Sequence, residues 1–259
     1  MIVFSAIVPH PPLSIPGIGD QQQLEKLKKT IDAIGELRVG LENVEPDTVM
    51  IITPHGRMEK YNFVINKNSV LEGNLEKLGL WEIFSYKNNP ALVEEIIYTC
   101  NVNELPIHGH YDELDHGALI PIYHLLKNMT PRIVHISFSL LDFERHFEFG
   151  KLIGEIVNYM SGRVAVIASA DLSHRLTEDA PAGYSPSAKF FDQKVIEILL
   201  QKDLSRLMKL EKHVITEAAE CGLRSIIILL GIMNGRKYST KILSYEFPFG
   251  VGHLVARLV

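Results

Sequence analysis

Three short apolar runs, each followed by a histidine, constrain the fold of this chain more than any other feature. Residues 2–8 precede His10, residues 48–53 precede His55, and residues 164–170 precede His174. Runs of β-branched and aliphatic residues with few polar positions are typical of strands buried on both faces, as in parallel sheets covered by helices. Open α/β sheets bind ligands beyond the carboxyl ends of their strands. The sequence therefore predicts that three histidines far apart in the chain share one pocket.

The remaining pattern alternates between strands and amphipathic helices. We expect helices over residues 21–41, 90–100, 117–127, 142–160, 185–201 and 218–233, and further strands over 61–65, 132–140, 241–246 and 252–259. This alternation predicts an α/β fold with three α/β/α layers around a mostly parallel, mixed central sheet. Because the 259 residues contain no repeat and no linker-like stretch, we expect a single domain over residues 1–259.

Composition excludes several classes of partner. The 31 acidic residues outnumber the 26 basic ones without a clustered basic stripe, so nucleic acid is not an expected partner. No apolar stretch approaches the roughly 20 residues that span a bilayer, so no membrane association is expected. Two cysteines cannot form a disulfide framework, and the first residues lack a signal-peptide pattern. We therefore expect a cytoplasmic protein.

His10 and His55 occur in closely matching contexts, Val-Pro-His-Pro and Thr-Pro-His-Gly. A proline restricts both its own backbone and that of the residue before it, so the chain is held where each imidazole must point. Either histidine alone could equally be bonded to backbone carbonyls at a strand end. The matching contexts favour a pair of metal ligands.

A third metal ligand is expected near residue 220. Two histidines and a carboxylate form the facial arrangement that suits non-heme Fe(II) and oxygen, and Glu220 is the best candidate because it begins an otherwise apolar helix. Alternatively, Glu220 is only an acidic residue of the first turn that the helix dipole stabilises, or it pairs with Arg224. Cys221 is the rival ligand. Adjacent helical residues differ by about 100° in direction, so the two are not expected to reach one ion equally well.

His174 and His116 are predicted to act on a bound substrate. His174 ends the segment Ser-Ala-Asp-Leu-Ser-His and would project into the crevice as a general acid or base, unless it only caps the next segment. Asp115 can cap a helix that begins near His116, and Gly117 permits close approach of a ligand. His116 would then lie near a helix N-terminus, which favours anions.

The other histidines carry weaker expectations. His124 and His135 fall in apolar segments and are interpreted as core residues whose nitrogens are bonded. His146 and His213 have charged neighbours and are expected to be solvated.

These motifs together resemble a known family. The ordered segments Pro9-His10-Pro11, Pro54-His55-Gly56, Asp115-His116-Gly117 through Pro121, and Asp171-Leu-Ser-His174 resemble the class III extradiol ring-cleaving dioxygenases and the related Memo proteins. The resemblance spans nearly the whole chain. It implies that His10 and His55 are Fe(II) ligands with a C-terminal carboxylate as the third, that His174 is the acid–base residue, and that His116 contacts substrate. The segment that begins at Cys221 instead resembles the Memo pattern, in which cysteine is the third ligand.

The first hypothesis is therefore a non-heme Fe(II) dioxygenase that cleaves a small catechol or aminophenol ring with O₂. The alternative is a Memo-like metal-binding protein without ring-cleaving activity, in which copper or zinc replaces iron because a thiolate favours softer metals. A small aromatic substrate and O₂ are the expected partners, and family analogy suggests a homodimer.

Overall fold

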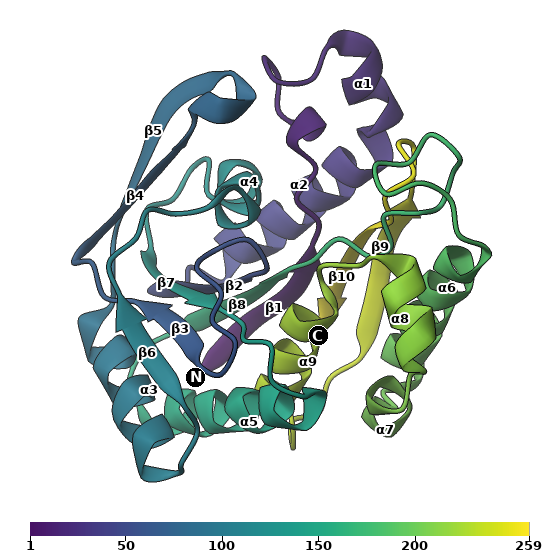
Figure 1. Ribbon diagram of the computed structural model, residues 1–259. Helices are drawn as coiled ribbons and strands as arrows, with labels where there is room; N and C mark the ends of the chain where they lie inside the picture. The colour runs from purple at the N-terminus through teal and green to yellow at the C-terminus, as the bar shows by residue number, and fades with distance from the viewer. Residues whose placement is uncertain (259) are drawn as a thin grey trace.

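The computed structural model describes residues 1–258 and is built around a mixed eight-stranded sheet (Figure 1). The strands of this sheet are β1 (Ile2–Val8), β2 (Thr48–Thr53), β3 (Phe63–Asn66), β6 (Ile107–His110), β7 (Arg132–Ser137), β8 (Val164–Ser169), β9 (Thr240–Glu246) and β10 (His253–Leu258). Their order is β6-β3-β7-β2-β8-β1-β10-β9. The four central strands β7, β2, β8 and β1 are mutually parallel, whereas β3, β10 and β9 each form an antiparallel pair. The predicted mostly parallel, mixed sheet is confirmed.

Helices cover both faces of the sheet. They are α1 (Gln21–Lys26), α2 (Lys28–Asn43), α3 (Pro90–Val102), α4 (His116–Leu125), α5 (Phe143–Tyr159), α6 (Pro186–Gln201), α7 (Leu204–Met208), α8 (Lys212–Ala218) and α9 (Leu223–Ile232), with 3₁₀ turns at Pro12–Ser14 and Glu76–Leu78. Figure 1 shows α2 and α4 on one side and α3, α5 and α9 on the other.

Alternate residues of the central strands pack into two separate cores. On β2, Val49 and Ile51 join the cluster that contains the buried residues of α2 and α4. Met50 and Ile52 point the other way, into the cluster formed with α3, α5 and α9. Successive side chains of a strand face opposite sides of a sheet, so β2 is buried on both faces, as the apolar run over residues 49–52 predicts. The three-layer α/β/α arrangement follows.

The strand order explains why distant histidines meet. β8 lies between β1 and β2, with Val8 opposite Ser169 and Ile52 opposite Ala168. The three strands are parallel, so the chain leaves all of them at the same edge of the sheet. His10 and His55 therefore emerge on either side of the segment that carries His174.

The structure differs from the sequence prediction in the region before the last helix. A continuous helix over residues 218–233 was expected, but α8 ends at Ala218 and α9 begins only at Leu223. Ala219 has φ +52°, in the left-handed region, and thus interrupts the helix. Glu220 and Cys221 lie in this loop, so the helical spacing argument that separated their directions does not apply.

Residues 66–87 form an element that the sequence pattern left undefined. β4 (Val70–Leu75) and β5 (Leu80–Lys87) pair as an antiparallel hairpin that stands apart from the main sheet and contacts α4 (Figure 1). Leu71 and Leu75 face the protein, while Trp81 and Ile83 are exposed. Within residues 1–258, no helix combines the length and the apolar character that crossing a bilayer requires.

Candidate metal centre

His10 is held in one tautomer by the neighbouring strand. It is 2% exposed, and its Nδ1 lies 2.8 Å from Ser169 Oγ. Ser169 Oγ also donates a hydrogen bond to the carbonyl of Gly117. Because a hydroxyl has a single proton, Ser169 must accept from the Nδ1–H of His10. The Nε2 atom of His10 is thus left with a free lone pair, as a metal ligand requires.

His55 faces His10 across the edge of the sheet. The two Nε2 atoms are 3.1 Å apart, and the rings meet edge to face at 4.9 Å between centroids. Burial, followed by the imidazoles of His10 and His116, lowers the pKa of His55 to about 4. Burial likewise lowers the pKa of His10, against the opposing effect of Asp171. Both rings are therefore neutral at pH 7, which is the form that binds metals.

Cys221, not Glu220, points toward this pair. Its Sγ atom lies 3.6 Å from His10 Nε2, and His10, His55 and Cys221 form a set whose ligand atoms are all within 4.8 Å of one another. The carboxylate of Glu220 instead accepts a hydrogen bond of 2.6 Å from the backbone N–H of Leu223, at the start of α9. Burial raises the pKa of Glu220 to about 7. The Glu220–Arg224 ion pair considered from the sequence does not form between these described residues. Arg224 lies over the rings of Phe138 and Phe143.

Close packing determines where the Cys221 loop lies. A Cβ atom on Gly222 would be 2.5 Å from the Cβ of Ala170 and 2.6 Å from the carbonyl oxygen of Asp171. Real Cβ atoms do not approach other atoms this closely, so a larger residue would push the loop away from the end of β8. Glycine at residue 222 therefore brings Cys221 within reach of His10.

Asp171 and His174 border the same cluster. Asp171 Oδ1 accepts the backbone N–H of His10 at 3.0 Å, and its Oδ2 lies 3.3 Å from His10 Nε2. Asp171, His174 and Cys221 form a second set of donors within 4.8 Å. The Nδ1 atom of His174 is buried and has no hydrogen-bond partner among the described residues. No role in the site was predicted for Asp171 from the sequence, although its place two residues after a buried strand was a usable signal.

His116 completes the group as the first residue of α4. Its ring stacks on His55 with centroids 4.3 Å apart and planes inclined by 25°, and lies 6.1 Å from His10. Asp115 caps this helix through a hydrogen bond from the N–H of Ala118. The structure thus brings together His10, His55, His116, His174 and Cys221, while Glu220 is turned toward the helix.

Four further histidines are placed as follows. His213 is exposed, as expected, and His124 is buried with its Nε2 2.8 Å from Ser14 Oγ. His135 is buried and bonded through one nitrogen only, to Asp115. The prediction for His146 is wrong: this ring is fully buried, with its nitrogens 2.6 Å and 3.1 Å from the carbonyls of Asp142 and Ser139. The charged neighbours of His146 predicted contact with water, but in the structure backbone carbonyls at the start of its own helix contact both ring nitrogens.

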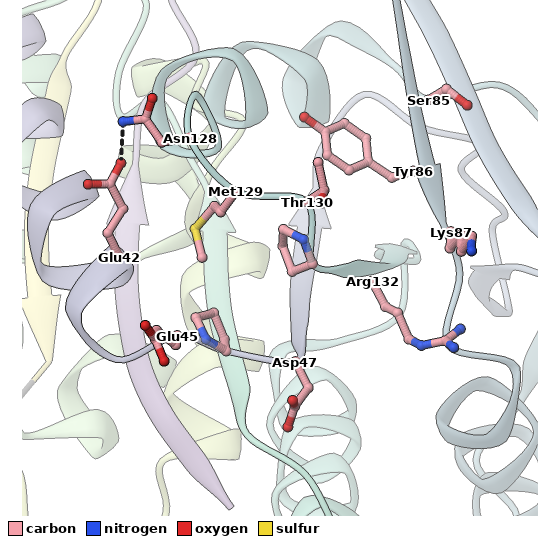
Figure 2. A pocket seen from close by; sticks show the side chains of 12 residues that line it. Glu42, Glu45, Asp47, Ser85, Tyr86, Lys87, Asn128, Met129, Thr130 and Arg132 are labelled. Atoms are coloured by element: carbon pink, nitrogen blue, oxygen red, sulfur yellow. Dashed lines mark hydrogen bonds between the residues drawn. The ribbon is translucent and has the colours of Figure 1, made fainter.

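A large cavity of about 900 Å³ lies at the opposite edge of the sheet (Figure 2). Asp47 and Arg132, which precede or begin parallel strands, line it together with Glu42, Glu45 and Lys87. Its charges are mixed, and none of the predicted site residues reaches it. A second cavity of about 670 Å³ is lined by Asp115, His116 and the turn of the β4–β5 hairpin. Because ligands of such sheets bind at the carboxyl ends of the strands, the second cavity is the one relevant to the histidine cluster.

The donor set fits a transition-metal ion. Two neutral imidazoles and one cysteine converge from the ends of β1 and β2 and from the loop before α9, and the free lone pair of His10 faces the other two. Two histidines with one thiolate are ligands typical of zinc and copper, whereas two histidines with one carboxylate are typical of non-heme iron.

With this fold and this cluster, the chain belongs to the family of the catalytic LigB subunit of aromatic ring-opening dioxygenases, which it matches over residues 5–256. It is 31% identical over 266 residues to protein CA_C1420 of Clostridium acetobutylicum, which covers 97% of this chain. It is also similar to 3,4-dihydroxyphenylacetate 2,3-dioxygenase of Escherichia coli, at 26% identity over 51% of the chain. The MEMO1 family protein MJ0403 of Methanocaldococcus jannaschii is 27% identical over 76% of the chain.

The chain spans 56%, 51% and 64% of the lengths of these three relatives. The crystal structure of the Escherichia coli K12 protein JW3007 has the same fold, with a TM-score of 0.72 and 15% identity over 99% of each chain.

Proposed function

We propose that this protein is a Memo-like metal-binding protein whose ion is held by His10, His55 and Cys221. The observation that carries the proposal is the contrast between two adjacent side chains. The thiol of Cys221 lies 3.6 Å from His10 Nε2, whereas the carboxylate of Glu220 is bonded to the backbone of α9. A site with one sulfur and two imidazole ligands favours copper or zinc over Fe(II). The similarity to MJ0403 is consistent with this proposal.

A ring-opening dioxygenase is the second candidate, and the positions of His174 and His116 favour it. Both border the proposed ligand set, and the cavity beside His116 offers space for a small aromatic ring. A bound Fe(II) ion would supply one-electron chemistry with O₂ and sites for the two substrate oxygens. His174 would accept a proton from a substrate hydroxyl, since its buried Nδ1 has no partner among the described residues. His116, at a helix N-terminus, would stabilise negative charge on the substrate oxygen.

Metal titration of two neighbouring variants tests the first proposal. Purified protein is loaded anaerobically with Cu(I), Zn(II) or Fe(II), and stoichiometry and affinity are measured by elemental analysis and chelator competition. We expect Cys221→Ala to weaken binding by at least about 100-fold because a ligand is lost. Glu220→Gln keeps an oxygen for the N–H of Leu223, so its affinity should remain within about threefold of wild type. The reverse result, a loss only in the Glu220 variant, would contradict the sulfur-containing site.

Oxygen uptake separates the two candidates. The Fe(II)-loaded protein is mixed with a panel of catechols and 2-aminophenols in an oxygen electrode. The Memo-like proposal expects no substrate-dependent uptake. Uptake that requires Fe(II) and disappears in His174→Gln would instead support the dioxygenase.

A further inference from the structure

The carboxylate of Asp115 joins three elements beneath the candidate metal centre. Its Oδ1 accepts hydrogen bonds from Thr53 Oγ1 at 2.6 Å and from the N–H of Ala118 at 3.2 Å. Its Oδ2 accepts from His135 Nε2 at 2.8 Å. The side chains of Asp115 and His135 are 11% and 0% exposed. One buried carboxylate therefore connects the end of β2, the start of α4 and the middle of β7.

These bonds lead directly to His55. Thr53 Oγ1 gives its proton to Asp115, so the same oxygen can accept the backbone N–H of His55, at 3.2 Å. The orientation of the His55 backbone thus depends on Thr53, and that of Thr53 depends on Asp115.

The same carboxylate also places His116. Asp115 begins α4, and the ring of the first helical residue stacks on His55. Gly117 brings this helix end into direct contact with β2, because a Cβ there would be 2.7 Å from Thr53 Oγ1 and 3.1 Å from His55 Cδ2. A shift of Asp115 would therefore move His55 and His116 together.

Capping of α4 does not account for the whole arrangement. Asp142 caps α5 in the same way, through the N–H of Arg145 at 2.8 Å. Among the described residues His146 is bonded only to the backbone carbonyl of Asp142, and no histidine is bonded to its carboxylate. Serine or asparagine would cap α4 about as well as aspartate does. At Asp115, burial favours the neutral acid, but the hydrogen bonds from His135 and Thr53 hold the pKa well below its usual value. Capping therefore does not explain why the second oxygen of Asp115 accepts a hydrogen bond from a buried histidine.

We propose that Asp115 and His135 are a positioning pair that aligns His55 for metal binding and places His116 against its ring. Among the described residues no hydrogen bond joins the pair to His10 or Cys221, and it acts through Thr53 and the start of α4. The inference rests on the proposed function because metal affinity is its principal readout. Groups that orient metal ligands through hydrogen bonds typically change metal affinity by about 10- to 100-fold when they are removed.

The test compares two helix-capping aspartates. Asp115→Asn and Asp142→Asn each remove one capping charge, but only the first disturbs His135 and Thr53. We expect Asp115→Asn to weaken Zn(II) binding by about 10- to 100-fold and Asp142→Asn to leave it within about threefold. Equal affinities in wild type and the Asp115 variant would overturn the proposal.

Variants of His135 provide the second arm, in case Asp115→Asn fails to fold. His135→Leu removes the donor to Asp115 and should lower Zn(II) affinity by about tenfold or more. His135→Gln, whose amide N–H can reach the same carboxylate, should restore most of the affinity. The visible spectrum of the Co(II)-loaded protein should change in the leucine variant and return in the glutamine variant. A general loss of packing would leave the glutamine variant as weak as the leucine variant.

Failure of the proposed function gives a different pattern, since then wild type itself would not bind metal. In that case, the imidazole NMR signals of the metal-free protein decide. A single sharp His55 resonance in wild type that broadens or splits in His135→Leu, and not in Asp142→Asn, supports the positioning pair. Identical His55 resonances in all three proteins would refute it.

Discussion

The lone pair that His10 offers to the site depends on a hydroxyl group of the neighbouring strand. Ser169 accepts from Nδ1 and donates to the carbonyl of Gly117, so its one proton determines which nitrogen of His10 is free. The motif Val-Pro-His-Pro predicted where His10 would point. It contains no information on Ser169, which lies 159 residues away and becomes a partner only through the pairing of β1 with β8.

Replacement of Ser169 by alanine tests this dependence. Without the acceptor, the Nδ1–H of His10 is buried and unpaired, and the tautomer with its proton on Nε2 becomes competitive. We expect Ser169→Ala to weaken metal binding by about 10- to 100-fold and to destabilise the fold by about 1–3 kcal/mol.

Chelator competition and the ¹⁵N shifts of the His10 ring measure the two effects of this change. Ser5→Ala is the matched control, because Ser5 is also a buried strand serine that donates to a carbonyl, that of Leu258 at 3.0 Å. Unchanged ring shifts in the Ser169 variant would show that another group selects the tautomer.

At the scale of elements, the central strands and most helices follow from local pattern, but the break before α9 does not. Residues 49–52 and 164–168 are uniformly apolar and lie in buried strands. Ala218, Ala219 and Cys221 are small or apolar and precede a strongly apolar run, so the sequence predicts one helix through them. In the structure the left-handed Ala219 ends α8, and Gly222 packs against the end of β8. Such contacts cannot be read from the sequence of either segment.

The β4–β5 hairpin was missed for a related reason. Its strand pattern is weak because β5 exposes Trp81 and Ile83, while β4 alternates buried Leu71, Gly73 and Leu75 with polar residues. The hairpin packs on α4 and not into the main sheet, so its buried face is small. Its turn nevertheless contributes to the cavity beside His116.

Substitution of Gly222 tests the role of the loop between α8 and α9. The backbone of Gly222 has φ −98°, which alanine adopts freely, so Gly222→Ala acts only through the close contacts with Ala170 and Asp171. We expect a loss of about 1–3 kcal/mol in the free energy of unfolding, as for other overpacked sites. Metal affinity should fall at the same time, because the loop moves Cys221 away from His10.

Gly35→Ala in α2 is the control, since nothing lies within 4 Å of a Cβ there. It should stabilise the protein by up to about 1 kcal/mol and leave metal binding unchanged. Urea unfolding and chelator competition report the two quantities. A Gly222 variant with normal metal affinity would show that the loop tolerates displacement.

For the whole molecule, one buried acid links the site to the far edge of the sheet. Asp192 of α6 is fully buried, accepting from the N–H of Ser173 at 2.9 Å and from the hydroxyl of Tyr245 on β9 at 2.7 Å. These bonds hold the segment that carries His174 against α6 and β9. Burial nevertheless raises the pKa of Asp192 from its usual 3.8 to about 6, against the effects of Tyr245, Ser173 and His174.

This raised pKa predicts how the stability of the whole fold depends on pH. The folded protein holds the Asp192 proton more tightly than the unfolded chain, so ionisation of this group favours unfolding. The stability that protonated Asp192 contributes is complete below about pH 4, declines as the pH rises to about 6, and is lost above that. The gap between 3.8 and about 6 corresponds to about 3 kcal/mol. Asp115 and Asp171 act in the opposite direction, because their pKa values are lowered and their contributions are lost in acid.

The difference in the free energy of unfolding between wild type and Asp192→Asn isolates the ionisation of Asp192 from that of the other buried acids. Asparagine is isosteric and does not ionise, so relative to wild type it should gain about 2 kcal/mol between pH 4.5 and pH 7, because part of the roughly 3 kcal/mol is already lost below pH 4.5. Urea unfolding across this range measures the difference, with Tyr245→Phe as a control that removes a bond to Asp192 and keeps the acid. Asp192 restrains the segment that carries His174. If Asp192→Asn stabilises the protein, this segment stays in place and metal affinity should be unchanged. A difference that does not vary with pH would mean that Asp192 is already ionised in the folded protein at pH 4.5, and that its two hydrogen bonds outweigh the cost of burial.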